Sequence, residues 1–341
     1  MPNVAIVGFG FMGAMHLQVY AQIKGSKVVA VVDNQLAKAK RDLAKLQLKI
    51  PVFASLEEML AVCAVDIIDI CLPTKLHTPF FLKAIAAGKH VFCEKPLALT
   101  AADGRRIAAA AKKSGVYVQI GQCIRFWPEY QALEAFVKSR KAGKLLSLSL
   151  QRRAGRPGYS VGDWLNDGTL SGGAALDLHI HDTDYVHHLL GKPAAVTSAG
   201  TRDKTGWSHI FTTYHFPAVA VTAEGGWNYP GKWGFQMAFQ AVFERGAVEF
   251  DSGGSPTLWL TLANGKKEPM PFTAPAAGES TTGAGNLSSL GGYYNEIATF
   301  INCIERRSAP KIATVSQAAD SLATTLAEIQ SAATGRTVKL K

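Results

Sequence analysis

The 341-residue sequence lacks any apolar run near the roughly 18 residues that a membrane-spanning helix needs. Its first residues enter an apolar segment at once, without the basic stretch and small-residue cleavage site of a secretory signal. Five widely spaced cysteines form no CxxC pair, so we expect reduced, mostly buried thiols rather than disulfides or zinc ligands. Together these absences predict a cytoplasmic protein without a membrane partner.

The net charge of +10 raises the question of nucleic-acid binding. The basic residues are spread out, and the densest runs, 38–49 and 138–144, have the pattern of solvated helix faces. No basic-aromatic stripe or DNA-binding motif accompanies them. We therefore expect no nucleic-acid partner, and attribute to the charge only a mild attraction for an anionic cofactor.

Length and composition favour two domains, because 341 residues with 48% hydrophobic and 18% charged side chains can bury substantial cores. Over residues 1–121, short apolar runs alternate with helical patterns, which predicts an α/β domain with a doubly wound parallel sheet of the Rossmann type. Two expected helices begin with capping boxes, Ser55 with Glu58 and Thr100 with Asp103. The runs expected to be strands are 4–7, 27–32, 67–71, 90–93 and 116–120.

The pattern changes in residues 122–341, where one apolar run follows another from 194 to 262 with little helical periodicity. This predicts an α+β domain with a large, mainly antiparallel open sheet. Residues 264–290, rich in Gly, Pro, Ser and Thr, are expected to form a loop. The other expected elements are helices at 128–142, 173–190, 293–306 and 315–334, strands at 145–150 and 338–340, and a glycine-rich loop at 154–171. The helix at 315–334 can pack back on the Rossmann domain.

The first expected strand leads into a glycine-rich turn that opens a helix, Gly8-Phe9-Gly10-Phe11-Met12-Gly13. In such a GxGxxG motif the first glycine permits the tight turn, the second lets the backbone approach a pyrophosphate, and the third allows close packing of helix and strand. The helix N-terminus offers N–H groups to the phosphates. Asp33 ends the second strand about 20 residues further on, where a carboxylate can accept hydrogen bonds from an adenosine ribose. We expect a dinucleotide site formed by Gly8, Gly10, Phe11, Met12, Gly13 and Asp33.

NAD is expected as the cofactor rather than NADP. The 2′-phosphate of NADP would lie against the Asp33 carboxylate. Proteins that bind NADP usually accommodate this phosphate with a nearby arginine. No arginine follows directly in Asn34-Gln35-Leu36, although Lys38 is close in sequence.

Two polar segments follow directly after expected parallel strands, at the sheet edge where open α/β sheets bind ligands. The first is Cys71-Leu72-Pro73-Thr74-Lys75-Leu76-His77, and the second is Glu94-Lys95-Pro96. A Glu–Lys pair at a strand end resists burial unless it has partners, which favours a site. The alternatives are a surface salt bridge between Glu94 and Lys95, and a His77 that begins a helix and contacts nothing.

A third polar group lies in residues 171–184, SGGAALDLHIHDTD. If this segment is helical, Asp177 and His181 stand one turn apart on one face, and Asp184 follows on the same face. A carboxylate at this spacing can orient an imidazole and stabilise its protonated form, which suits a general base. The alternatives are a metal site and a partly buried polar helix face. The candidate metal ligands, His179, His187 and His188, show no HExxH-type spacing, which argues against the metal.

The segments GFGFMGAMH, CLPTKLH, EKP, SGGAALDLHIHDTD and YYNEIATF occur in the order and spacing of a known family. Over nearly its whole length the sequence resembles the glucose-fructose oxidoreductase / inositol dehydrogenase / MocA (Gfo/Idh/MocA) family. The resemblance implies a Rossmann domain followed by an α/β domain whose open sheet often forms homodimer or homotetramer contacts. It also implies NAD(P)-dependent redox chemistry, usually on sugars, sugar derivatives or cyclitols.

The resemblance also assigns roles to single residues. Lys95 resembles the family's catalytic lysine, which hydrogen-bonds the reacting hydroxyl, while Asp177 resembles the substrate-binding acid and His181 the general acid/base. Arg125 falls where the family commonly has an arginine near the site. Beside the glycine turn and Asp33, the positions that match segments bordering the ribose and nicotinamide are Pro73, Thr74, His77 and Glu94. Two departures from the family pattern, His179 and Ala174, fall near the expected substrate pocket.

The expected reaction is reversible hydride transfer between nicotinamide and a secondary alcohol or ketone. His181 would take the hydroxyl proton, and the Lys95 ammonium would hold the same oxygen and stabilise alkoxide charge, so no metal is needed. The two side chains must then converge on one oxygen in the crevice between the domains. The loop residues expected to contact the substrate are Arg153, Arg156, Tyr159 and Trp164. For Trp164 the alternative is packing of the loop onto the sheet.

Two other functions remain open from the sequence. A protein of this fold can bind NAD(P) as a non-catalytic regulator or sensor, although the presence of Lys95, Asp177 and His181 argues for an enzyme. The substrate can also be a non-sugar compound, such as a trans-dihydrodiol or an imine.

Overall fold

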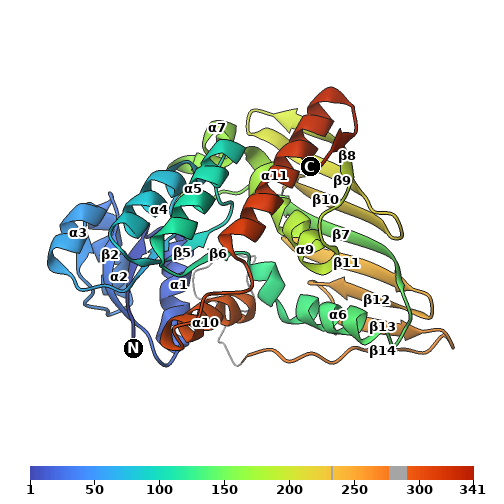
Figure 1. Ribbon diagram of the computed structural model, residues 1–341, viewed down its shortest axis with the longest axis horizontal. Coiled ribbons are helices and arrows are strands. Elements are labelled where there is room, and N and C mark those ends of the chain that lie inside the picture. Colours follow the sequence, from blue (N-terminus) through green and yellow to red (C-terminus); the bar gives the residue numbers. More distant parts are fainter. Residues whose placement is uncertain (232, 276–289) are drawn as a thin grey trace. The chain divides into compact units, whose positions relative to one another are not determined.

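The computed structural model describes residues 1–231, 233–275 and 290–341 (Figure 1). The chain divides into two compact units. The first unit consists of Met1–Gln122, Tyr159–Gly162 and Pro275–Ala319, and the second of Cys123–Gly158, Asp163–Ala274 and Asp320–Lys341. No helix among the described residues has the length and apolar character needed to cross a membrane.

The first unit contains a parallel sheet of six strands in the order β3-β2-β1-β4-β5-β6. This is the Rossmann order, and it confirms the predicted doubly wound sheet. The strands are β1 (Asn3–Val7), β2 (Lys27–Val32), β3 (Val52–Phe53), β4 (Ile67–Ile70), β5 (His90–Glu94) and β6 (Val118–Gly121). The order reverses between β1 and β4, so the carboxyl ends of these strands border the crevice where such sheets bind ligands.

Helices cover both faces of this sheet. They are α1 (Phe11–Gln22), α2 (Leu36–Lys45), α3 (Leu56–Val62), α4 (His77–Ala86), α5 (Ala101–Ser114) and α10 (Gly291–Glu305), with a 3-10 turn η1 (Thr74–Leu76) before α4. The helices α4 and α5 lie together on one face, while α1 and α10 pack against each other on the other (Figure 1). At both predicted capping boxes the N-cap bond forms, because the Ser55 and Thr100 hydroxyls accept hydrogen bonds from the N–H groups of Glu58 and Asp103. The return bonds differ: the Glu58 carboxylate accepts the Ala54 N–H, and the Asp103 carboxylate accepts the Thr100 hydroxyl.

The second unit is built on a nine-stranded sheet in the order β14-β13-β12-β11-β7-β10-β9-β8-β15. All neighbouring strands are antiparallel except β7 and β10, which confirms the predicted mainly antiparallel sheet. The strands are β7 (Leu145–Gly155), β8 (Ala195–Asp203), β9 (Gly206–His215), β10 (Ala220–Tyr229), β11 (Gln236–Phe243), β12 (Gly246–Asp251), β13 (Leu258–Leu262), β14 (Lys267–Pro269) and β15 (Val338–Lys339).

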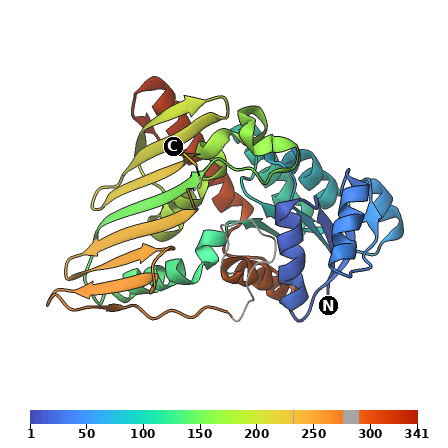
Figure 2. The same cartoon turned by 180° about the vertical axis from the view of Figure 1, so that it is seen from behind.

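The helical segments of the second unit are η2 (Cys123–Phe126), α6 (Pro128–Ser139), η3 (Val161–Asn166), α7 (Gly168–Ser171), α8 (Gly173–Asp177), α9 (Ile180–Leu190) and α11 (Val315–Thr334). The first two residues of η3 and the first five of α11 belong to the first unit. The helices α6, α9 and α11 lie on one face of the sheet (Figures 1 and 2). Among the described residues, the opposite face carries no helix in either view.

Three sequence expectations for this part of the chain need correction. The helix expected at 128–142 ends at Ser139, because Arg140 adopts a left-handed conformation with φ of 56°. The loop expected at 264–290 contains the short strand β14, which pairs with β13, and its residues 276–289 lie outside the described chain. The loop expected at 154–171 contains the helical turns η3 and α7.

Candidate active site

The glycine turn after β1 has the geometry of a phosphate cradle. Gly8 has φ of +93°, and its N–H donates to the Val32 carbonyl at 2.8 Å. A Cβ atom at Gly13 would lie 2.0 Å from the Gly8 carbonyl oxygen, so only glycine fits there. A Cβ atom at Gly10 would meet only Val161 Cγ2, at 3.9 Å, so the described chain leaves the space above Gly10 open.

The start of α1 is equally suited to an anion. Its N-cap is Gly10, so within the described part of the chain the N-cap position provides no side-chain hydrogen bond to the first N–H groups. Unpaired N–H groups and the positive end of the helix dipole at this position bind phosphates well. The residues present therefore fit a dinucleotide pyrophosphate.

Asp33 is held rigidly at the end of β2. One carboxylate oxygen accepts the N–H of Phe9 at 2.7 Å, and the other accepts the N–H of Gln35 at 2.7 Å. The nearby Lys38 forms an ion pair with Asp42, at 2.8 Å between Nζ and Oδ2. The carboxylate therefore links the second strand to the glycine turn.

Tyr159 lies beside the glycine turn that follows β1. Residues 159–162 belong to the first unit, and the Tyr159 ring packs against the Phe11 ring with 5.1 Å between centroids. The sequence prediction assigned Tyr159 to the substrate, whereas its observed neighbour belongs to the predicted dinucleotide site. Trp164, from the same loop, packs against a small apolar cluster that includes Ala174 and Trp227. This packing agrees with the alternative considered for Trp164.

The segment after β4 is anchored by His77. Its Nδ1 lies 2.7 Å from the Pro96 carbonyl oxygen, and its Nε2 lies 2.8 Å from the Leu72 carbonyl oxygen. The ring is buried, so the alternative of a histidine that contacts nothing is wrong. His77 thus joins the two polar strand ends. Pro73 and Thr74 lie between Leu72 and His77 in sequence, and Thr74 is buried at the start of η1.

Glu94 and Lys95 do not form the alternative surface pair, because the Glu94 side chain is buried. Glu94 Oε1 lies 3.0 Å from Nε2 of His16, and its Oε2 accepts the Lys95 backbone N–H at 3.2 Å. Lys95 itself is partly exposed at the carboxyl end of β5. The strand end therefore presents a lysine beside a fixed, buried carboxylate.

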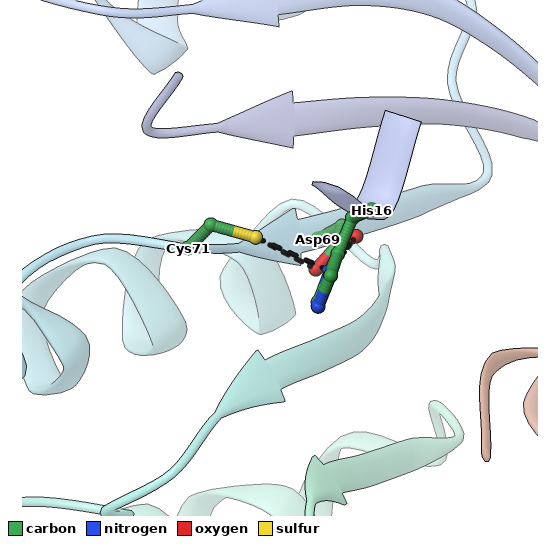
Figure 3. A group of neighbouring side chains, drawn as sticks. All are labelled: His16, Asp69 and Cys71. Atoms are coloured by element: carbon green, nitrogen blue, oxygen red, sulfur yellow. Dashed lines mark hydrogen bonds and ion pairs between the residues drawn. The ribbon is translucent and has the colours of Figure 1, made fainter. Parts of the chain in front are cut away.

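A buried polar cluster surrounds His16, which sequence reasoning missed. His16 Nδ1 lies 2.8 Å from Asp69 Oδ2, and both side chains are fully buried. Figure 3 shows Cys71 and His16 pointing toward Asp69. Glu296 of α10 is also fully buried next to His16 and Glu94, and among the residues that the structure describes neither of its carboxyl oxygens has a hydrogen-bond partner. We call His16, Asp69, Glu94 and Glu296 the His16 network.

The charges of the His16 network follow from these contacts. Burial alone lowers the pKa of His16, but the Asp69 carboxylate, together with Cys71, raises the pKa well above its usual value. Burial raises the pKa of Glu296, and the Glu94 carboxylate raises it further. We therefore interpret His16 as an imidazolium and Glu296 as a neutral acid.

The same residues form the two groups, among those that the structure describes, in which a metal ion could be held: His16 with Asp69 and Cys71, and His16 with Glu94 and Glu296. Both groups depend on the His16 ring. Each ring nitrogen faces a carboxyl oxygen at hydrogen-bond distance, so His16 interpreted as an imidazolium offers no lone pair to a metal. The geometry thus favours a proton-holding cluster.

Replacing Glu296 with glutamine should flatten the pH dependence of stability. An acid with a raised folded pKa binds more protons in the folded state, so its contribution is complete below the unfolded pKa of about 4.3 and is lost as pH rises toward the folded pKa. Glutamine at position 296 cannot ionise, and should remove a slope of up to roughly 1.4 kcal/mol per pH unit. Urea unfolding at a series of pH values measures this.

The matched control for that variant is Glu244→Gln, because Glu244 is exposed. Its unfolding free energy should follow the wild-type pH curve. Parallel pH curves for the wild type and Glu296→Gln would contradict the neutral-acid interpretation.

In the second unit, the predicted helix 173–190 is interrupted. The helix α8 ends at Asp177 and α9 begins at Ile180. At the break, the His179 N–H donates to the Ala174 carbonyl at 2.9 Å, a five-residue step instead of the usual four. Such local widening is frequent at functional sites. Asp177 and His181 therefore flank a helix break, rather than sharing one regular helix.

His181 is nearly buried in α9, and its Nδ1 lies 4.0 Å from Cys123 Sγ. Asp177 is partly exposed at the end of α8. Two neighbouring acids have other partners. Asp184 accepts two hydrogen bonds from Arg125 at 2.6 and 2.7 Å, and Asp182 pairs in the same way with Arg152, with all four side chains buried.

The Arg125 contact bears on its predicted role. Its Nε and Nη2 are committed to Asp184, which also accepts a hydrogen bond from Ser321 of α11 at 2.7 Å. This joins η2, α9 and α11, so Arg125 helps to hold α9, the helix that carries His181. A direct contact of Arg125 with the substrate stays a prediction. Of the two arginines expected to contact the substrate from the loop, Arg153 lies in β7 instead and pairs with Glu224, and Arg156 pairs with Asp203.

The other histidines of this segment have separate partners. His179 is fully buried, and its Nε2 lies 3.0 Å from Glu328 of α11. His187 contacts Thr324 at 2.9 Å, and His188 contacts Glu134 at 3.1 Å. In the described part of the chain, none of these histidines belongs to a group close enough to share a metal ion.

Comparison with known proteins identifies the family of the chain. Residues 2–122 match the family described as "Oxidoreductase family, NAD-binding Rossmann fold", and residues 130–249 match the "GFO/IDH/MocA C-terminal domain". Inositol 2-dehydrogenase 1 of Paenarthrobacter aurescens is 30% identical over 259 residues, which cover 74% of this chain and 75% of that protein.

Two solved structures share the fold. An oxidoreductase from Agrobacterium radiobacter, in complex with NAD+, L-tartaric acid and magnesium, has a TM-score of 0.85 at 18% identity, covering 99% of this chain and 98% of the other. Aldose-aldose oxidoreductase from Caulobacter crescentus, complexed with glycerol, has a TM-score of 0.82 at 22% identity, covering 99% of both chains. By its glycine turn, its two strand-end motifs and these matches, the chain belongs to the Gfo/Idh/MocA family of NAD-binding oxidoreductases.

Proposed function

We propose that the chain is an NAD-dependent dehydrogenase that oxidises, reversibly, a secondary alcohol of a sugar, sugar derivative or cyclitol. The observation that carries the proposal is the position of Lys95. It follows β5 at the ligand-binding edge of the Rossmann sheet, on a backbone fixed by Glu94. The relative named inositol 2-dehydrogenase supports the substrate class.

The proposed mechanism assigns one task to each polar group. NAD, when bound, supplies the acceptor for the hydride of the carbinol carbon. His181 takes the hydroxyl proton, and Asp177 binds the substrate and orients it toward His181. The Lys95 ammonium donates a hydrogen bond to the same oxygen and stabilises the negative charge that develops on it. In the reductive direction, His181 returns the proton.

For the cofactor, we propose NAD rather than NADP, held by Gly8, Gly10, Phe11, Met12, Gly13 and Asp33. The Asp33 carboxylate is fixed by two backbone N–H groups, so it can accept the ribose hydroxyls without moving. Lys38 is paired with Asp42, which leaves a 2′-phosphate facing the Asp33 charge. The segments with Pro73, Thr74, His77 and Glu94 border the ribose and nicotinamide.

Replacing Asp33 with alanine should weaken NAD binding by about 10- to 100-fold, the range for a hydrogen bond to a charged group. The affinity for NADP should fall much less, because the variant also loses a repulsion. Titration of both cofactors by protein fluorescence gives the two dissociation constants. Since Asp33 also holds Phe9 and Gln35, the melting temperature is the control. Equal losses for both cofactors would show that Asp33 is structural only.

The proposed activity is tested by formation of reduced NAD over a panel of cyclitols, aldoses, sugar acids and anhydrosugars. Turnover of at least one such alcohol is expected. A trans-dihydrodiol and a cyclic imine with NADH extend the panel to the non-sugar alternative. Tight NAD binding without turnover of any compound would contradict the proposal and favour a sensor.

We also propose that the protein is cytoplasmic and forms a homodimer or homotetramer through the open face of the nine-stranded sheet. Exposed apolar side chains on these strands, Phe211 and Val242 among them, support a contact with another copy. Light scattering should give a mass that is a multiple of the single chain, and a monomer would contradict this proposal.

A further inference from the structure

The His16 network includes Glu94, which directly precedes Lys95 at the end of β5. Its members come from four elements: His16 from α1, Asp69 from β4, Glu94 from β5 and Glu296 from α10. Glu94 is the last residue of β5, so its backbone leads straight into Lys95. A change in the network therefore reaches Lys95 through a single peptide bond.

The His16 ring is fixed on every side. It bridges Asp69 at 2.8 Å and Glu94 at 3.0 Å, both contacts are buried, and with His16 interpreted as an imidazolium both are charge-assisted. The edge of the Phe92 ring meets it, with 5.6 Å between centroids. Charge-assisted bonds of this kind are roughly twice as strong as neutral ones. Rotation of the ring would break both, so one Glu94 oxygen has a fixed position.

The other Glu94 oxygen and His77 hold the backbone around Lys95. Glu94 Oε2 accepts the Lys95 N–H at 3.2 Å. On the far side, the Pro96 carbonyl oxygen lies 2.7 Å from His77 Nδ1. The backbone is therefore bonded both before and after the Lys95 side chain branches from it.

Two further residues make room for this arrangement and balance its charge. A Cβ atom at Gly121 of β6 would lie 3.0 Å from Glu94 Oε1, so a larger residue would press on the carboxylate that His16 holds. Glu296, as a neutral acid, lies near Glu94 without adding a second negative charge beside it. Cys71 Sγ lies 3.3 Å from His16 Nδ1 and completes the polar groups around the ring.

We propose that His16 is a positioning residue of the reaction, which acts through Glu94 to fix the backbone from which the Lys95 ammonium reaches the substrate oxygen. The proposal rests on the proposed function, in which Lys95 binds that oxygen. It differs from a purely structural role because the effect must pass through the Nε2–Glu94 contact, and not through the Nδ1–Asp69 contact.

Two substitutions at the same position separate these contacts. The amide of asparagine reaches about as far as His Nδ1, and the amide of glutamine about as far as Nε2. His16→Asn thus keeps a partner for Asp69 and loses Glu94, whereas His16→Gln keeps a donor for Glu94. We expect kcat to fall about 10- to 100-fold in His16→Asn, the scale of a small misplacement of a catalytic group. In His16→Gln, kcat should fall several-fold less, and the dissociation constant of NAD should change little in either variant.

The matched control is His90→Asn. His90 begins the same strand at its opposite end and accepts a hydrogen bond from the Tyr117 N–H. This variant should keep the wild-type kcat. If His16→Asn does not fold, Gly121→Ala presses on Glu94 while His16 is retained, and the same fall in kcat with unchanged NAD binding is expected. Equal kcat in the His16→Asn and His16→Gln variants, or a wild-type kcat in Gly121→Ala, would overturn the proposal.

A second readout needs no turnover. Reductive methylation of Lys95, followed by mass spectrometry at a series of pH values, reports the environment of its amine directly. His16→Asn should shift this profile, while His16→Gln and His90→Asn should follow the wild type. A shifted profile in a protein that oxidises no alcohol would refute the proposed function and leave the positioning role standing. Identical profiles in all four proteins would refute the positioning role.

Discussion

Replacing Lys95 with alanine should lower kcat about 10²- to 10³-fold and leave NAD affinity nearly intact. This is the usual cost of removing one donor that stabilises an oxyanion in a transition state. The Lys95 side chain is partly exposed and extends from a backbone held by Glu94, so its removal should not disturb the glycine turn. Steady-state turnover of the best alcohol from the panel, with NAD titration in parallel, measures both quantities.

Lys95→Met is the companion variant, because it keeps most of the side-chain length without the charge. It should be as slow as the alanine variant if the ammonium is what matters. Lys75→Ala, a change of the exposed lysine in η1, is the control and should keep the wild-type rate. A Lys95 variant with a normal rate would remove the lysine from the mechanism.

Replacing His181 with asparagine should lower kcat/KM about 10²- to 10⁴-fold, the range for a lost general base. The pH dependence should change as well. In the wild type, the rate of alcohol oxidation should fall on the acid side as the His181 base becomes protonated, and in the variant that fall should disappear. A pH profile of kcat/KM measures both effects.

His188→Asn is the matched control, since it makes the same substitution on the same helix. His188 contacts Glu134 at 3.1 Å and has no role in the proposed mechanism. It should keep both the wild-type rate and the acid-side fall. If His181→Asn retained that fall, another group would have to be the base.

The first unit could be predicted well because its signals are local. A strand, a glycine turn, a helix and an acid follow one another within residues 3–33, and each is readable without knowledge of distant contacts. The N-cap bonds of Ser55 and Thr100 are also local signals, since donor and acceptor lie three residues apart. Such patterns determine local structure almost by themselves.

The His16 network shows why the rest could not be predicted. Its bonds join residues separated by 53 and 78 positions, so no local pattern pairs them. Two signals were nonetheless present in the sequence. Asp69 is a charged residue inside the apolar strand 67–70, and Glu296 lies in the apolar run of α10. A buried carboxyl group must either be paired or lose its charge, and this alone indicates a polar cluster in the core.

Prediction of the second unit from the sequence was limited in the same way. The nine-stranded sheet depends on the parallel pairing of β7 with β10, which are separated by helices and two other strands. The break between α8 and α9 was equally hidden, because residues 174–190 contain no glycine or proline that would mark it. Arg125 and Asp184, both noted near the expected site, meet each other in a buried pair.

In the proposed mechanism, Lys95 and His181 act on one substrate oxygen. A double-mutant cycle measures this directly, by comparing kcat/KM of Lys95→Ala, His181→Asn and the variant with both changes. Groups that act as a unit are strongly non-additive, so the double variant should be within roughly 3-fold of the slower single variant. A loss equal to the product of the two single losses would show that the two residues act independently, and would contradict the mechanism.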